Sequence, residues 1–194
     1  MQPKHPRTGT NAKPGSRVQL IPYIEINGIR TFKDTDVMGF YDRMEKDKTA
    51  PVVFHDGQIR DAKGFLRFMR SPGVALYVVY ADNELAGLLW LTDAKPKTCM
   101  VHFVAFSEFW QNNSVEIGRT SIARIMEMKD KSGAYLFDVL QGLLPSWNTR
   151  AIKWLKAIGL EVVGEIPKVL WDAQRNSSVD GTLLYLTREL LTEG

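Results

Sequence analysis

Residues 113–120 could bind a phosphate-containing ligand, because they join an apolar strand to a predicted helix with Gly118 in its first turn. The first turn of a helix leaves backbone N–H groups without partners, and the helix dipole adds partial positive charge there. Together with the Arg119 guanidinium, these groups suit a pyrophosphate. The alternative is a tight turn in which Gly118 only allows close packing, and the segment alone does not decide between the two.

A second helix start, at Asn148, has a more specific spacing. Asn148 or the nearby Ser146 can cap the predicted helix, and Ala151 follows Asn148 by one turn. Gly159 ends the helix directly before a strand, as glycine often does. The segment therefore places an amide side chain at a well-defined helix start, where it could hydrogen-bond a ligand.

Side chains that could exchange a proton lie on or beside apolar strands. Glu108 follows one such strand, His102 lies within it, and Asp138 interrupts the next. Each could act as a general base, and the hydroxyls of Ser146 and Tyr135 could act as the acid. Each also has an ordinary interpretation: Glu108 as a solvated loop carboxylate, His102 as a packed ring, and Asp138 as a carboxylate facing solvent.

Other common catalytic and metal-binding patterns are absent from the sequence. There is no Walker A motif, no G-x-G-x-x-G, no G-x-S-x-G and no H-E-x-x-H. The single cysteine, Cys99, excludes an intramolecular disulfide and a cysteine-based zinc site. The three histidines lie far apart in the sequence, so we expect no metal.

Composition points to one globular domain. The chain has 194 residues, is 44% hydrophobic and 24% charged, and carries a net charge of +3. That charge is too small to indicate nucleic-acid binding, although the basic N-terminal tail leaves it open as an alternative. No secretory signal and no run of about 18 apolar residues is present, so we expect a cytoplasmic protein without a membrane span.

The pattern of apolar residues predicts an α/β chain with a mixed sheet. We expect residues 1–17 to be a disordered basic tail and residues 18–194 to form one domain. The predicted strands are 18–26 and 29–32 (a hairpin around Asn27-Gly28), a short extended piece at 51–57, and 74–81, 86–92, 100–106, 134–140, 160–166 and 181–188. The first predicted helix begins at Asp34 or Asp36. Two more cover 59–70 and 117–130, with Glu127 and Lys131 paired on the second. The last is the helix that ends at Gly159.

The segment that begins at Asn148 resembles the C-terminal half of the GCN5-related N-acetyltransferase (GNAT) superfamily. The family has Asn, then Ala or Ser three residues later, an aromatic residue or Leu at seven, and Gly-Phe at eleven and twelve. Asn148, Ala151, Leu155, Gly159 and Leu160 occupy those positions. Leu155 stands where many relatives have a Tyr that protonates the leaving thiolate.

Residues 113–120 align with the pyrophosphate loop of that family, Arg/Gln-x-x-Gly-x-Gly/Ala. Gly118 matches the second glycine, whereas Asn113 replaces Arg or Gln and Glu116 replaces the first glycine. The resemblance covers about residues 52–190. The last third looks most like the branch that acetylates protein N-termini, and a bacteriophage or prophage relative is also plausible.

The resemblance implies a GNAT fold, with a mostly antiparallel sheet of six to seven strands and about four helices. It implies transfer of an acetyl group from acetyl-CoA to an amine, with a non-catalytic CoA- or partner-binding protein as the alternative. The edge at 182–187 could pair in a homodimer. The implied contacts to acetyl-CoA come from the strand end and from the two helix starts: Val104, Phe106, Ser114, Val115, Ile117, Gly118, Arg119, Thr120, Asn148 and Ala151.

Overall fold

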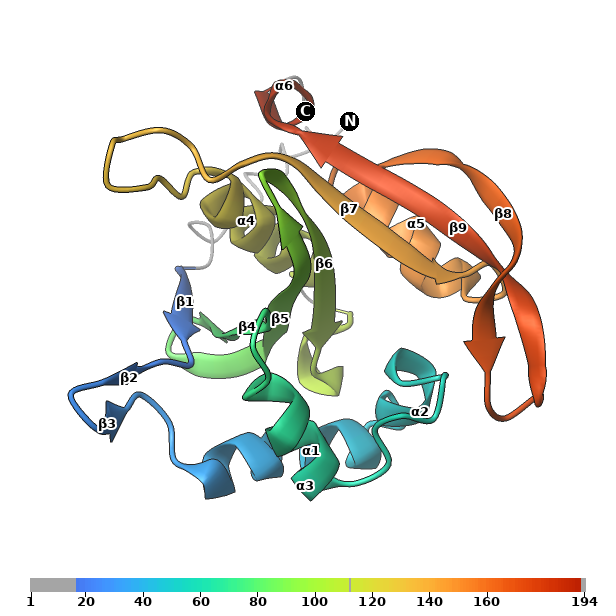
Figure 1. Cartoon of the computed structure of the whole chain (residues 1–194), viewed down its shortest axis with the longest axis horizontal. Helices are drawn as coiled ribbons and strands as arrows, with labels where there is room; N and C mark the ends of the chain where they lie inside the picture. Colours follow the sequence, from blue (N-terminus) through green and yellow to red (C-terminus); the bar gives the residue numbers. More distant parts are fainter. Residues whose placement is uncertain (1–16, 112, 193–194) are drawn as a thin grey trace, which may run out of the picture.

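A seven-stranded sheet organises the molecule, with the strand order β1-β4-β5-β6-β7-β9-β8 (Figure 1). The computed structural model describes residues 17–111 and 113–192, so most of the predicted tail lies outside the described residues. Among the neighbouring strands of this sheet, β6 and β7 are the one parallel pair, and the other pairs are antiparallel. The strands are β1 (Val18–Pro22), β2 (Glu25–Ile26), β3 (Ile29–Arg30), β4 (Ala75–Ala81), β5 (Glu84–Lys95), β6 (Lys97–Ala105), β7 (Phe137–Pro145), β8 (Glu161–Asp172) and β9 (Ser177–Thr187).

Helices cover both faces of this sheet. One face packs on α1 (Asp34–Lys46), α2 (Ala50–Val53) and α3 (Ala62–Met69), and the other packs on α4 (Ser114–Met126) and α5 (Thr149–Ala157). The short α6 (Arg188–Thr192) follows β9. No helix among the described residues is both long and apolar enough to cross a bilayer.

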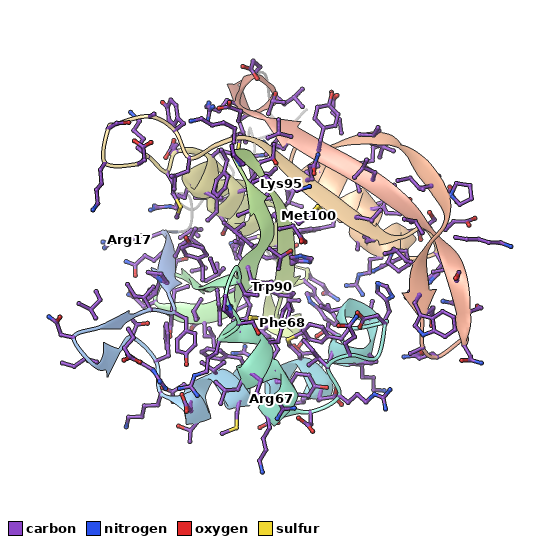
Figure 2. The ribbon with its side chains drawn as sticks, viewed as in Figure 1. Arg17, Arg67, Phe68, Trp90, Lys95 and Met100 are labelled. Atoms are coloured by element: carbon purple, nitrogen blue, oxygen red, sulfur yellow. The ribbon has the colours of Figure 1, made fainter. Side chains whose placement is uncertain are left out.

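Strand alternation divides the core in two. Leu88 and Trp90 of β5 lie in the core beneath α1 and α3, and Leu89 and Leu91 lie in the core beneath α4. Phe68 of α3 packs against the first of these cores, and Figure 2 labels both Trp90 and Phe68.

Several predicted elements are confirmed. The stripe predicted for the first helix is the buried face of α1: Val37, Phe40, Tyr41 and Met44. The residues of the turn between β2 and β3 have φ values of 53° and 78°, as a type I′ turn requires, although each strand is only two residues long. The first strand, β1, pairs with β4 at the edge of the sheet, which tolerates Pro22.

Three expectations were wrong. Residues 51–57 are not extended, because Ala50–Val53 form a helical turn with Pro51 near its start, a favourable place for proline. The helix predicted at 117–130 covers 114–126, so Glu127 and Lys131 lie beyond its end and form no i,i+4 pair on it. Residues 182–187 are not an edge, since β9 lies between β7 and β8.

The parallel strands β6 and β7 separate halfway along their length. Their pairing covers Lys97–Met100 of β6 and ends there. Residues 101–105 of β6 pair with β5 on one side, and no strand of the described residues pairs with them on the other (Figure 1). At this end β5 carries a bulge, and Gly87 approaches β6 so closely that a Cβ would lie 2.2 Å from the carbonyl oxygen of Val104. The divergence therefore leaves one backbone edge of β6 unpaired.

The tip of the β8–β9 hairpin contacts the loop after α2. The Nδ1–H of His55 donates to the carbonyl oxygen of Trp171 (2.8 Å), and the amide of Ala173 donates to the carbonyl oxygen of His55 (2.8 Å). The buried carboxylate of Asp172 accepts hydrogen bonds from the amides of Gln174 and Arg175, which shape the tip. These contacts join the β8–β9 hairpin to the helical layer that packs on β4 and β5, at the end where β6 and β7 lie apart.

Candidate functional site

A cavity of about 420 Å³ lies beside the unpaired edge of β6. That volume is in the range of pockets for small molecules and cofactors. Its walls come from the end of α1, from α2, from β6, and from the starts of α4 and α5. The lining residues are Asp47, Lys48, Thr49, Val52, Val53, Phe103, Val104, Ala105, Trp110, Ser114, Trp147, Asn148, Thr149, Arg150, Ala151 and Trp154.

The helix α5 starts at the predicted capping residue, and its first turn lies in the cavity wall. Asn148 is the N-cap, and its Oδ1 accepts a hydrogen bond from the amide of Ala151 at 3.2 Å. The Arg150 guanidinium lies 4.6 Å from the centre of the Trp110 ring, and the Trp110 indole donates to the carbonyl oxygen of Ala105 (2.7 Å). Both predicted contact residues of this helix, Asn148 and Ala151, therefore line the cavity.

The start of α4 differs from the predicted pyrophosphate loop. The helix begins at Ser114, three residues earlier than predicted, so the amide of Ile117 already donates to the carbonyl oxygen of Asn113 (2.8 Å). Gly118 consequently lies in the second turn, where a Cβ would lie 2.5 Å from the Trp154 ring. Arg119 donates to the carbonyl oxygen of Ala157 (3.1 Å). Gly118 and Arg119 thus hold α4 against α5, as the close-packing alternative expected for Gly118.

The other predicted contact residues divide between cavity and core. Val104 and Ser114 line the cavity. Phe106 is fully buried in the core beneath α1, and the Arg43 guanidinium lies 4.1 Å from its ring centre. Ile117 is buried on the face of α4 that packs on the sheet. Of the remaining two, Val115 is exposed and Thr120 is half-buried, and neither lines the cavity.

The predicted base Glu108 forms an ion pair outside the cavity lining. Its carboxylate accepts a hydrogen bond from Arg43 at 2.9 Å. That bond lowers the pKa of Glu108, because it stabilises the charged form. Glu108 is therefore a weaker base than an ordinary glutamate and is already paired with a cation.

His102 is half-buried and packs against Trp90 of the neighbouring strand. Its ring stacks on Trp90 with a centroid distance of 5.2 Å, and its Nε2 lies 3.0 Å from the Thr92 hydroxyl. Burial lowers the pKa of His102 to about 4, because the charged imidazolium is poorly solvated there. The ring is absent from the cavity lining, in agreement with the packed interpretation.

Asp138 and Ser146 also lie outside the cavity lining. Asp138 is on the half of β7 that still pairs with β6, and its exposed carboxylate pairs with Arg188. The Ser146 hydroxyl lies 2.9 Å from the Thr182 hydroxyl, and its amide donates to the carbonyl oxygen of Asp180 (2.9 Å). The exposed Tyr135 ring lies 4.2 Å from the Arg188 guanidinium and does not line the cavity either. The five predicted acid or base residues are thus not brought together at the cavity.

Asp47, which is the acidic residue of the cavity lining, was not identified from the sequence. It is the C-cap of α1, and its carboxylate accepts two hydrogen bonds from Ser107. Ser107 lies two residues beyond the end of β6. The two residues lie 60 positions apart in the chain. A helix C-cap next to Lys48 is an ordinary surface pattern, so no local signal could have linked Asp47 to the strand end.

The cavity lining also includes a buried hydrogen-bond donor on Trp154. The indole Nε1 of Trp154 is buried and has no hydrogen-bond partner within the described part of the chain. Buried donors usually have a partner. Within residues 17–111 and 113–192 no group of three His, Cys, Asp or Glu side chains is arranged to hold a metal ion.

Solved structures with the same fold include bacterial acetyltransferases. One from Salmonella typhimurium, which modifies the N-terminal serine of a 50S ribosomal subunit protein, matches with a TM-score of 0.67 at 11% identity, over 88% of this chain and 94% of that chain. Spermidine N-acetyltransferase from Vibrio cholerae, in complex with CoA and spermine, gives 0.63 at 11% identity, over 92% and 98%. Ribosomal-protein-S5-alanine acetyltransferase from Vibrio fischeri gives 0.63 at 14%, over 92% and 96%.

No family model and no curated protein sequence matches the chain. The structural matches nevertheless cover nearly the whole chain and nearly the whole of each neighbour. The chain therefore has the fold of the GNAT acetyltransferases, as the resemblance at Asn148 predicted.

Proposed function

We propose that this protein is an N-acyltransferase that moves an acetyl group from acetyl-CoA to a primary amine. The observation that carries the proposal is the unpaired edge of β6 at residues 101–105, beside a cavity of about 420 Å³. An exposed strand edge offers backbone N–H and C=O groups to any extended ligand that carries amides. The two amides of a pantetheine arm are such a ligand.

Three parts of the cavity wall would hold acetyl-CoA. The β6 edge would pair with the pantetheine amides, and Asn148 at the start of α5 would hydrogen-bond the same arm. The first amides of α4, at Ser114 and Val115, would face the pyrophosphate, since Gly118 and Arg119 are used in packing. The unpartnered Trp154 indole is a further donor in this wall.

Acetyl-CoA supplies an activated thioester carbonyl. The nitrogen of a neutral amine attacks that carbonyl, so that a C–N bond forms and the C–S bond breaks. The proton lost by nitrogen finally protonates the departing thiolate through water, which balances the reaction. A donor to the transient oxyanion is needed. The amides of Phe106 and Ser107 already donate to Ala86 and Asp47, and the amide of Val104 faces β5 as that of Phe106 does, which leaves the amide of Ala105 as the candidate.

A thermal-shift titration with acetyl-CoA, CoA and ATP tests cofactor binding. A ligand at about 100 times its Kd adds roughly 2.7 kcal/mol, or about 5–10 °C for a domain of this size. We expect that shift with acetyl-CoA and CoA and none with ATP. The absence of a shift at millimolar acetyl-CoA would refute the proposal.

A matched pair of variants locates the binding site. Asn148→Asp keeps the oxygen that caps α5 but loses the amide N–H donor, so we expect normal stability and about tenfold weaker acetyl-CoA binding. Asp61→Asn makes an equally small change at the N-cap of α3, away from the cavity, and should leave binding unchanged. Release of free CoA thiol in the presence of an amine then measures transfer.

A further inference from the structure

Asp47 differs from every other residue of the cavity lining because it alone carries a negative charge. The remaining charged residues of the lining, Lys48 and Arg150, are cations, and the rest are neutral. Among the described residues no ion pair involves Asp47, whereas Glu108 pairs with Arg43. One carboxylate without a cationic partner thus borders the cavity.

The backbone at Asp47 is fixed by the way α1 ends. The amide of Lys48 donates to the carbonyl oxygen of Glu45 (3.0 Å), and the amide of Thr49 donates to that of Met44 (2.9 Å). Lys48 has a positive φ of 58°. These are the features of a Schellman motif, which ends a helix in a single defined conformation.

Ser107 fixes the carboxylate itself. Its amide donates to Oδ2 of Asp47 at 2.8 Å, and its hydroxyl donates to Oδ1 at 2.7 Å. A carboxylate can accept about four hydrogen bonds. Each oxygen of Asp47 therefore keeps capacity for a further donor, at the end of the unpaired β6 edge where the acetyl group is to be transferred.

We propose that Asp47 binds the ammonium group of the acceptor, so that the substrate class is primary amines that are protonated at neutral pH. The bound ammonium gives one proton to water, and its nitrogen, then neutral, attacks the thioester carbonyl. This inference rests on the proposed acetyltransferase function. An ammonium ion is the one common ligand group with three N–H donors and a positive charge, which complements a held carboxylate. The two cations of the lining, Lys48 and Arg150, repel an ammonium group, which leaves Asp47 as the charged residue of the lining that attracts one.

Kinetics of Asp47→Asn test the inference, with Asp42→Asn as the matched control. Asp42 is exposed on the same helix and does not line the cavity, so the control removes the same charge elsewhere. The probes are spermidine, 2-phenylethylamine and the tripeptide Ala-Ala-Ala. For each probe that the wild type acetylates, we expect Asp47→Asn to raise KM about 10- to 100-fold and Asp42→Asn to change it less than about twofold.

A second measurement does not depend on turnover by the variant. In the presence of CoA, the wild type should bind Ala-Ala-Ala at least about tenfold more tightly than its analogue propionyl-Ala-Ala, which lacks the amino group. Asp47→Asn should bind the two peptides with equal affinity. The acetyl-CoA thermal shift should be unchanged in Asp47→Asn, which shows that the variant is folded.

The outcomes separate this inference from the proposed function. If acetyl-CoA produces no thermal shift in the wild type, the proposed function fails. If acetyl-CoA binds but none of the probes is acetylated, or if Asp47→Asn keeps the KM of the wild type, the assignment of Asp47 and its amine class is overturned. A raised KM with an unchanged cofactor shift supports it.

Discussion

Gly118→Ala distinguishes two roles for Gly118 that the sequence alone could not separate. In the structure Gly118 is buried where α4 crosses α5. An added Cβ would lie 2.5 Å from Cζ2 and 2.8 Å from Cη2 of Trp154, and 3.0 Å from Cγ2 of Ile158. Real Cβ atoms essentially never lie as close as the Trp154 distances, so the two helices must separate or Trp154 must move.

The magnitude follows from two opposing effects. Overpacking a well-packed contact costs about 1–3 kcal/mol. Replacing glycine by alanine inside a helix stabilises it by about 1 kcal/mol. The net result is a loss of about 1 kcal/mol, which lowers Tm by about 2–4 °C in a domain of this size. Because Trp154 lines the cavity, its displacement should also weaken acetyl-CoA binding several-fold.

Thermal melts with and without acetyl-CoA measure both quantities. The control is Gly39→Ala in α1, where a Cβ would meet nothing within 4 Å. That change should raise Tm by about 2–4 °C, since only the helix propensity acts. If Gly118→Ala were stabilised as much as Gly39→Ala, the steric reasoning would be wrong. Normal stability with lost acetyl-CoA binding would favour a pyrophosphate contact at Gly118.

Three further results are expected from other sites. Burial lowers the pKa of His102 to about 4, so between pH 6.5 and 4 the unfolded chain binds more protons than the folded one. The free energy of unfolding should therefore fall with falling pH, and in urea titrations His102→Gln should remove about 3 kcal/mol of that fall. Asp61→Ala removes the N-cap of α3, whose Oδ1 accepts from Gly64 at 2.6 Å, and should cost about 1 kcal/mol by urea unfolding. Burial raises the pKa of Cys99 to about 12, so a disulfide reagent should modify the native thiol at least about 100-fold more slowly than the unfolded one.

Much of the fold was predictable because its signals are local. Residues with positive φ in the turns, such as Asn27, Gly28, Asp82 and Asn83, are types that tolerate that conformation. The helical turn at Ala50–Val53 was missed for a physical reason: it has four residues, too few to show a period, and two of them are valine, which favours strands. Tertiary packing of Ala50 in the core decides its conformation.

The candidate site was predictable only in part. Asn148 is both a helix cap and a family motif, so its place in the cavity wall followed from its neighbours in sequence. Placing Gly118 in the first turn failed because Asn113 and Ser114 begin the helix early, with Asn113 in a left-handed conformation (φ 64°). Asp47 was missed because the hydrogen bonds that link it to the end of β6 come from Ser107, 60 residues away in the chain.

The tie between His55 and the β8–β9 tip gives the opening between β6 and β7 a closed perimeter. The paired residues Lys97–Met100 form its other end. An opening closed at both ends resists widening, since either end must break before its sides can part. Hydrogen exchange at the Ala173 amide would report how often this perimeter breaks.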